Sequence, residues 1–160
     1  MAGGIVQNDV IKNPSPQLQA FLRWTDAMTV KRDPVALADS VTDDLAYQTL
    51  PASMGFPPRD KAGFLQFSSL TFMAMLEDFW SEIHEVVETA DTIAVHASGK
   101  ATSITGAPYA NEYTVIAHVA KQANGEYKIS AMKEFLDSKV LLEFMAAEKQ
   151  RQEERAKAAA

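Results

Sequence analysis

Four consecutive segments rich in β-branched and aromatic residues fill most of the second half of this 160-residue sequence, and they constrain the fold more than any other feature. They span residues 80–88, 92–103, 109–121 and 127–136. Short turns separate them, and the last turn contains Asn124-Gly125, a pair that strongly favours a hairpin. Because strands joined by such short turns pair antiparallel with their neighbours, we predict a meandering antiparallel sheet.

Helical patterns precede these strands. Ser15 and Asp33 each stand before a proline, which is typical of a helix N-cap followed by its first turn. The second of these helices is predicted to end near residue 43, and residues 45–50 then alternate like a strand. Apolar residues recur at helical spacing over residues 60–76 and predict a third helix. Helices followed by a curved sheet indicate an α+β domain whose helices cover one face of that sheet.

We expect one domain at residues 15–147, with a flexible leader at residues 1–14 and a charged tail at residues 148–160. Asp137-Ser138 is a cap signal for a last helix that carries apolar residues at first. Charged residues and alanine dominate beyond Glu148. A helix without an apolar stripe has little to pack against, so this tail is predicted to fray into solvent.

The composition excludes several classes of function. The chain is 47% hydrophobic, has a formal charge of -6 and lacks cysteine, so neither disulfides nor thiolate chemistry are available, and a cytoplasmic location is expected. An acidic balance argues against binding the nucleic-acid backbone. No apolar run reaches the roughly 18 residues of a membrane span, and no export signal is predicted. We therefore expect the function to lie in a pocket.

The sequence also lacks the common motifs that bind metals or nucleotide cofactors. The three histidines lie on three different predicted strands, without the close spacing of a metal site. The sequence contains no glycine-rich phosphate loop and no Gly-x-Ser-x-Gly elbow. We expect neither a metal nor another cofactor.

Two stretches resemble a known family. Gly125-Glu-Tyr-Lys-Ile-Ser-Ala-Met-Lys-Glu-Phe-Leu-Asp137 resembles the last hairpin of SnoaL-like proteins, and Asn111-Glu-Tyr-Thr-Val-Ile-Ala-His118 resembles the preceding strand of fungal members. The resemblance covers about residues 15–145. It implies the nuclear-transport-factor-two-like fold, a cone of curved sheet around N-terminal helices with a deep apolar pocket, and a homodimer. It does not by itself imply catalysis, because the superfamily also contains binding proteins.

A further match is to limonene epoxide hydrolase. Tyr47-Gln-Thr-Leu-Pro51 is similar to the tyrosine-bearing strand of that enzyme, and Glu134 falls where it keeps a catalytic carboxylate. Where that family has an arginine and an aspartate two residues apart, this chain has His96 and Ser98. The resemblance thus implies a site around Tyr47 and Glu134 from which the hydrolytic charge relay is missing.

Glu134 is the main catalytic candidate. Side chains two residues apart share one face of a sheet, so an inward Glu134 takes Met132 and Leu136 with it and leaves Lys133 to water. Burial raises the pKa of a carboxyl group, which suits a general acid or base near neutral pH. The alternative is a glutamate at the pocket rim, or one paired with a surface lysine.

Tyrosines supply the candidate hydrogen-bond donors. Tyr109, Asn111 and Tyr113 share one face of a predicted strand, where two phenols can hold a carbonyl or a developing oxyanion. We predict Tyr109 and Tyr113 as catalytic and Asn111 as substrate-binding. The alternative is that these are ordinary strand residues whose polar tips reach water.

The remaining candidate site residues are supported by fewer features of the sequence. His96 is predicted as catalytic because its neighbours two residues away, Ala94 and Ser98, are small and imidazole titrates near physiological pH. Its alternative is a buried histidine bonded to a backbone carbonyl. Further predicted substrate-binding residues are Tyr47, Thr49, Phe72, Met73 and Met132, of which Phe72 and Met73 also fit a plain core.

Taken with these candidate residues, the resemblance to fungal SnoaL-like proteins implies a cofactor-independent tailoring enzyme of secondary metabolism. It would isomerise, cyclise or rearrange a small polycyclic, polyketide or alkaloid substrate by general acid/base catalysis, a semipinacol rearrangement included. Two alternatives stay open: a non-catalytic small-molecule-binding or dimerisation module, and an epoxide hydrolase. The expected partners are an apolar or polycyclic substrate and a second copy of the chain.

Overall fold

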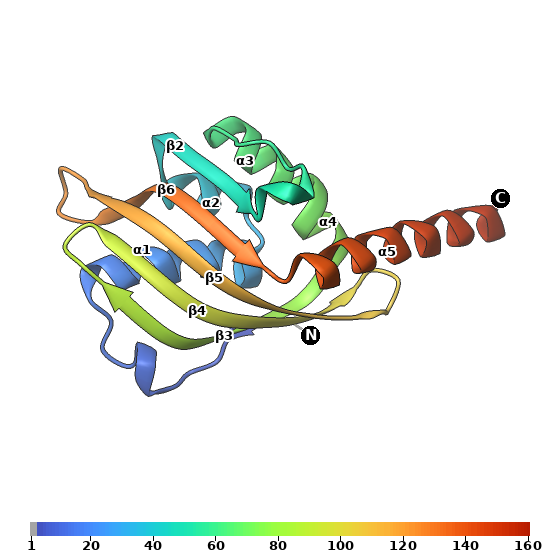
Figure 1. Cartoon of the computed structure of the whole chain (residues 1–160), viewed down its shortest axis with the longest axis horizontal. Helices are drawn as coiled ribbons and strands as arrows, with labels where there is room; N and C mark the ends of the chain where they lie inside the picture. Colours follow the sequence, from blue (N-terminus) through green and yellow to red (C-terminus); the bar gives the residue numbers. More distant parts are fainter. Residues whose placement is uncertain (1–2) are drawn as a thin grey trace.

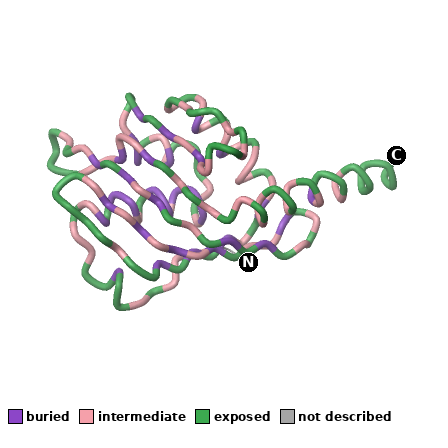
Figure 2. Tube along the Cα trace, in the orientation of Figure 1, coloured by how far each residue is buried: buried purple, intermediate pink, exposed green. Residues whose placement is uncertain are grey.

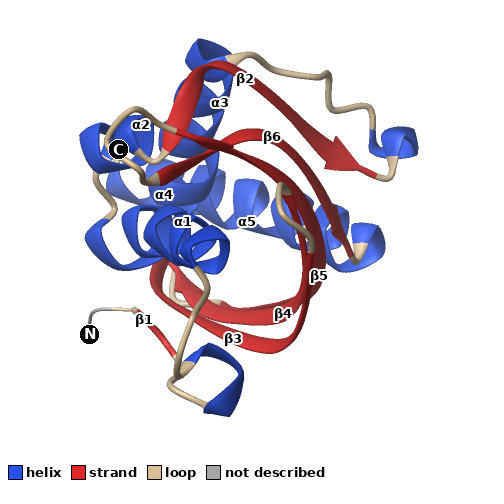
Figure 3. Cartoon of the chain, turned by 90° about the vertical axis from the view of Figure 1, so that its left-hand side faces the viewer, coloured by secondary structure: helices blue, strands red, loops and turns tan. Residues whose placement is uncertain are grey.

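The computed structural model describes residues 3–160 as a six-stranded curved sheet around N-terminal helices (Figures 1 and 3). The strands are β1 (Gly4–Ile5), β2 (Val41–Leu50), β3 (Leu76–Glu88), β4 (Thr92–Ser103), β5 (Pro108–Lys121) and β6 (Tyr127–Leu136). The helices are α1 (Pro16–Thr25), α2 (Pro34–Asp39), α3 (Lys61–Phe67), α4 (Met73–Met75) and α5 (Ser138–Ala159). The predicted α+β cone is confirmed.

The sheet order is β1-β3-β4-β5-β6-β2. Strands β3 to β6 form the predicted antiparallel meander, whereas β1 pairs with β3 and β2 pairs with β6 in parallel. The β2/β6 register sets Tyr47 opposite Met132 and Thr49 opposite Glu134. This parallel pairing brings the first long strand beside the last one and places their inward side chains in one chamber.

The helices begin where the cap signals predict. Ser15, Asp33, Asp60 and Asp137 each accept a hydrogen bond from a backbone N–H in the first turn of a helix. The predicted boundary near residue 43 is wrong, because β2 already begins at Val41, which is buried and pairs with Ile129 of β6. Here pairing across the sheet overrides the local pattern.

Two helices change their winding where they face the sheet. The chain continues from α1 through a π-helical turn at Asp26–Lys31, and from α3 through another at Ser68–Phe72. A π turn contains more residues per turn than an α-helix and therefore shifts which side chains of the following segment face inward.

The core lies between α1 and the concave face of the sheet. Buried residues alternate along the strands (Figure 2), with Val95 and Ala97 of β4 and Val115 and Ala117 of β5 facing the helices. Phe21 of α1 belongs to the same cluster. The burial of these apolar side chains is the main contribution that stabilises a domain of this size.

The predicted leader packs against the body from residue 3 onward; residues 1–2 lie outside the described range. Gly4–Ile5 adds a parallel strand to β3, the amide of Asn8 donates to the carbonyl of Ile83 at 2.8 Å, and Ile11 is buried. The segment predicted as a flexible leader thus makes these contacts with the sheet. These residues cover an otherwise open sheet edge, which natural folds tend to protect.

The tail beyond residue 148 belongs to α5, which continues to Ala159, and its last turns project from the body (Figure 1). Glu148 is fully buried and accepts hydrogen bonds from Thr105 at 2.7 Å and from Arg151 at 2.9 and 2.8 Å. Arg155 donates to the carbonyls of Ile104 and Thr105. Polar contacts therefore hold this part of α5 against the turn between β4 and β5, although the helix has no apolar stripe there. Over residues 3–160, no helix is both long and apolar enough to cross a membrane.

Replacing Glu148 by glutamine is expected to lower the free energy of unfolding at neutral pH by about 2 kcal/mol, the scale of hydrogen bonds to a charged group. Burial opposes the charge, but Thr105 and Arg151 hold the pKa of Glu148 at about 2. Because this folded-state pKa lies below the unfolded value, the stabilisation is present above the unfolded pKa and lost as the pH falls towards about 2. Urea unfolding across this range checks the prediction. Glu143→Gln on the exposed side of the same helix is the control, and a pH-independent loss in Glu148→Gln would contradict it.

Candidate active site

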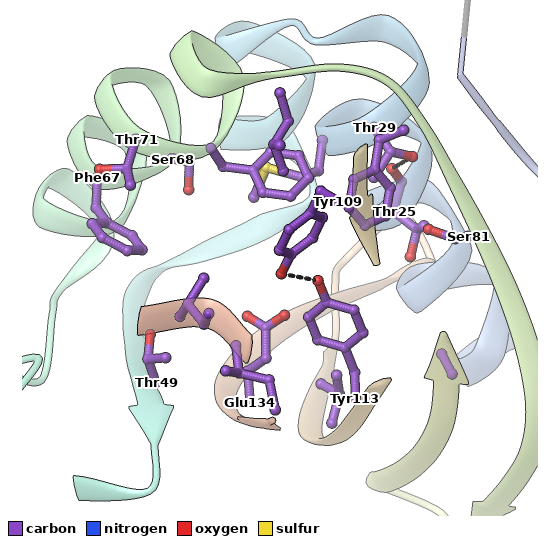
Figure 4. Close-up of a pocket in the computed structure, with 18 of the residues that line it drawn as sticks. Thr25, Thr29, Thr49, Phe67, Ser68, Thr71, Ser81, Tyr109, Tyr113 and Glu134 are labelled. Atoms are coloured by element: carbon purple, nitrogen blue, oxygen red, sulfur yellow. Dashed lines mark hydrogen bonds between the residues drawn. The ribbon is translucent and has the colours of Figure 1, made fainter. Parts of the chain in front are cut away.

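A largely apolar cavity lies between the helices and the concave face of the sheet (Figure 4). Its volume is about 1080 Å³, its open mouth included. Aromatic and methionine side chains make most of the wall, and Glu134 is the one carboxylate among the described residues that line it. No Asp, Lys, Arg or His of residues 3–160 belongs to the lining, and no group of three or more His, Asp or Glu in this range is placed to hold a metal ion.

Glu134 enters the cavity from β6. Its neighbours Lys133 and Phe135 are exposed, as the alternation of the strand requires. The hydroxyl of Tyr47 on β2 donates a hydrogen bond to Oε2 of Glu134 at 2.6 Å. The hydroxyl of Thr49 donates a hydrogen bond to that of Tyr47 at 3.3 Å. No described residue donates a hydrogen bond to Oε1. One carboxylate oxygen is therefore anchored, and the other is free to meet a ligand.

The surroundings of Glu134 set its protonation. Burial raises the pKa of Glu134, and the hydrogen bond from Tyr47 partly opposes that rise. Burial, followed by the nearby Glu134 charge, raises the pKa of Tyr47 well above its usual value. Tyr47 consequently keeps its proton while Glu134 can exchange one, which is the property required of a general acid or base.

Replacing Tyr47 by phenylalanine is expected to raise the pKa of Glu134 further, because the variant removes the hydrogen bond that stabilises the carboxylate. The ring itself stays packed on Phe64, whose centroid lies 4.7 Å away. Infrared titration of the protonated carboxyl band, assigned by its loss in Glu134→Gln, measures the shift. Tyr127→Phe, outside the cavity lining, is the control, and an unchanged or lowered pKa in Tyr47→Phe would contradict the assignment.

Two further tyrosines form a hydrogen-bonded pair opposite this carboxyl group. The hydroxyls of Tyr109 and Tyr113 on β5 lie 2.8 Å apart, and they meet beside the carboxyl group of Glu134 (Figure 4). Burial is the main cause that raises the pKa of both phenols. Whichever hydroxyl donates within the pair, the accepting one keeps a proton that can bind a ligand oxygen, and the first bond polarises the second.

Comparison of the coordinates with solved structures finds proteins of the same architecture. The pinacolase BvnE from Penicillium brevicompactum matches with a TM-score of 0.68 and 23% identity over 88% of this chain and 96% of its own. PrhC from Penicillium brasilianum matches at 0.69 and 19% over 86% and 93%. IdmH from Streptomyces antibioticus, a proposed polyketide cyclase, matches at 0.64 and 18% over 83% and 99%. The chain has the SnoaL-like, nuclear-transport-factor-two-like fold. No protein-family model and no curated protein matches the sequence itself.

The SnoaL-like cone brings together six of the residues predicted from the sequence. They are Tyr47, Thr49, Phe72, Tyr109, Tyr113 and Glu134, and all of them line the cavity. The four others lie elsewhere, each for a physical reason that the structure makes visible.

His96 lies on the outer face of the cone, so its predicted inward orientation is wrong. Its neighbours Val95 and Ala97 are the buried residues of β4, while the His96 ring nitrogen Nε2 lies 2.6 Å from a carboxylate oxygen of Glu112. The ring also lies beside that of His84, at 5.1 Å. The small residues Ala94 and Ser98 suggested room for a ligand, but burial of the larger apolar residues sets the face of the strand.

Asn111 is buried yet faces the backbone. Its amide donates to the carbonyl of Asp137 at 3.2 Å and accepts from the Asp137 N–H at 3.0 Å, which ties β5 to the start of α5. Met132 is 2% exposed and belongs to the core. Met75 lines the cavity in place of Met73, because the π turn at Ser68–Phe72 shifts the phase of the helix.

The sequence reasoning missed much of the helical wall of this SnoaL-like cavity. Trp24, Thr25 and Ser68 line it from the N-terminal helices, and Leu141 and Phe144 close it from α5. The Phe144 ring lies 4.8 Å from that of Tyr109. Inward residues of a helix show the same periodicity whether they fill a core or border a cavity, so no local signal separates the two.

Proposed function

We propose that this protein is a cofactor-independent isomerase or cyclase that acts on a small, apolar, polycyclic substrate by general acid/base catalysis. One observation carries the proposal: a carboxyl group with one free oxygen faces a pair of phenol hydroxyls inside an apolar chamber. The rings of the substrate fill the chamber, a carbonyl or hydroxyl oxygen binds the tyrosine pair, and Glu134 moves the proton.

For a carbonyl substrate, the ionised Glu134 removes a proton from the carbon next to the carbonyl. The C–H electrons form the enolate double bond, and the carbonyl oxygen takes up the negative charge beside Tyr109 and Tyr113. In a β,γ-unsaturated ketone the enolate is conjugated with the C=C bond, so protonated Glu134 can return the proton to the γ-carbon, which gives the conjugated isomer. When the enolate carbon instead attacks a second carbonyl carbon of the same molecule, a ring closes, the electrons of that C=O bond move to its oxygen, and this oxygen takes the proton.

A rearrangement needs the same groups. Glu134 removes a hydroxyl proton while a carbon substituent of the hydroxyl-bearing carbon migrates, with its bonding electrons, to the adjacent carbon, and the hydroxyl becomes a carbonyl. In the same step the adjacent carbon loses the C–O bond of an epoxide, and the released oxygen takes a proton from the Tyr109–Tyr113 pair. A pinacolase and a proposed polyketide cyclase share this fold, which supports these two reaction classes over hydrolysis. Epoxide hydrolysis finds less support, because the described lining offers neither the aspartate nor the arginine of the hydrolytic relay.

Deuterium exchange tests the proposal without knowledge of the natural substrate. The protein is incubated in heavy water with a panel of enolisable fused-ring ketones, and mass spectrometry follows deuterium at the carbon next to the carbonyl. We expect exchange above the rate in buffer for the ketones that bind. Binding without exchange would favour a non-catalytic binding module. Incorporation of oxygen from labelled water into the diol formed from an epoxide would favour a hydrolase.

A further inference from the structure

Two buried polar groups in the cavity wall have no partner among the described residues. They are the hydroxyl of Ser68 and the indole N–H of Trp24. Ser68 is 1% exposed and Trp24 is 7% exposed, and both line the cavity. Figure 4 shows the Ser68 hydroxyl pointing from the helical wall into the cavity, across from Glu134. Both residues belong to helical segments, whereas Glu134 belongs to the sheet.

Two other hydroxyls of the same wall, those of Thr25 and Thr29, are satisfied locally. Thr25 donates to the carbonyl of Phe21 at 3.0 Å, and Thr29 donates to the carbonyl of Thr25 at 2.7 Å. A buried donor without a partner destabilises a fold, and natural structures contain few of them. The contrast singles out Ser68 and Trp24 as groups for which the chain itself provides no acceptor.

We propose that Ser68 and Trp24 form a second polar subsite, which binds a carbonyl or hydroxyl oxygen of the substrate at a point remote from the reacting oxygen. The indole N–H can only donate, and a serine hydroxyl can donate as well, so the ligand group is an acceptor. The substrate class is then a fused-ring molecule with two separated oxygens, one at the Tyr109–Tyr113 pair and one at this subsite. The inference rests on the proposed binding of a polycyclic substrate in this cavity.

Such a subsite explains how a largely apolar cavity selects one orientation. Apolar contacts are non-directional and let a flat ring system slide or flip. A hydrogen bond at each end fixes both the position and the face of the substrate and thereby brings the reacting carbon to Glu134. The subsite is a binding device only and takes no part in the proton transfer.

Matched ligands test the subsite. Ketones of the decalin and androstane series are used, each as the monoketone and as the diketone with carbonyls at opposite ends, and calorimetry measures their dissociation constants. We expect one or more diketones to bind wild type more tightly than the matching monoketone. Ser68→Ala and Trp24→Phe should each reduce this preference by up to about tenfold, the scale of one hydrogen bond. Ser40→Ala, which removes a hydroxyl bonded to the carbonyl of Leu37 at 2.7 Å and lying outside the cavity lining, should leave the preference unchanged.

Two measurements keep the test interpretable. Since Ser68→Ala removes no protein hydrogen bond, its thermal midpoint is expected to equal or exceed that of wild type. In nuclear magnetic resonance, the indole N–H signal of Trp24 should shift with the diketone and not with the monoketone. The chain has one other tryptophan, Trp80, which is 48% exposed and serves as the internal reference.

An equal diketone preference in wild type, Ser68→Ala and Trp24→Phe would overturn the subsite, as would the absence of any diketone preference in wild type. An indole signal of Trp24 that stays unmoved would also overturn it. These failures are distinct from failure of the proposed function, which shows as proton exchange that persists in Glu134→Gln. Loss of exchange in Glu134→Gln, together with a wild-type diketone preference in Ser68→Ala and Trp24→Phe, would retain the catalytic site and remove the subsite.

Discussion

Replacing Glu134 by glutamine is expected to lower the rate of ketone deuterium exchange by about 10²–10⁴-fold, the usual contribution of a general acid or base. Glutamine keeps the size of the side chain and can still accept the hydrogen bond of Tyr47 through its amide oxygen, so the cavity and ligand affinity should change little. What disappears is the group that takes up and returns the proton. Exchange rates by mass spectrometry and dissociation constants by calorimetry separate these two properties.

Glu112→Gln is the matched control, because Glu112 lies on the outer face of the cone beside His96. Its exchange rate should equal that of wild type. Stability gives an independent check on Glu134. Since burial raises its folded-state pKa, the fold loses stability as the pH rises from the unfolded pKa through the folded one, and Glu134→Gln should be more stable than wild type at neutral pH. Turnover that survives the substitution would exclude Glu134 as the catalytic group.

The strand pattern of the sequence grouped the side chains that share one face of a strand, whereas the choice of Glu134 as the inward carboxylate came from the family resemblance. Alternation identified the bounds of β4 and β6, and the same alternation turns Glu134 inward with Met132 of the core and turns Tyr113 inward with Val115. In each case large apolar neighbours two residues away fix the face of the strand, because their burial outweighs other preferences. The orientation of His96 was predicted wrongly, because its neighbours two residues away are small and do not fix the face of the strand.

The alternation of residues along a strand does not predict contacts between segments that lie far apart in the sequence. The parallel pairing of β2 with β6 leaves no local signature, yet it brings Tyr47 to Glu134; only a family resemblance pointed to Tyr47. The docking of α5 likewise depends on Glu148, a charged residue in a polar stretch. Local periodicity predicts elements and faces, whereas partners that lie far apart in the sequence become apparent only in three dimensions.

Substitution in the Tyr109–Tyr113 pair is also expected to cause a large loss of exchange rate. Tyr113→Phe is expected to lower the exchange rate by about 10²-fold, the scale of removing one donor to a developing oxyanion. The variant removes one hydroxyl of the pair, and the remaining hydroxyl of Tyr109 loses the bond of 2.8 Å that orients and polarises it. Tyr127→Phe, outside the cavity lining, should retain the wild-type rate.

Double substitution distinguishes a pair that acts as a unit from two independent donors. Because either hydroxyl orients the other, Tyr109→Phe should lose nearly as much activity as Tyr113→Phe, and the double variant should lose little more than either one. Losses that multiply would show two independent contacts with the substrate, and a loss below about threefold in both single variants would remove the pair from oxyanion stabilisation. Because the phenyl rings preserve the contacts of Tyr109 with Phe79 and Phe144, a non-additive loss would locate the effect in the shared hydrogen bond rather than in the packing of the cavity wall.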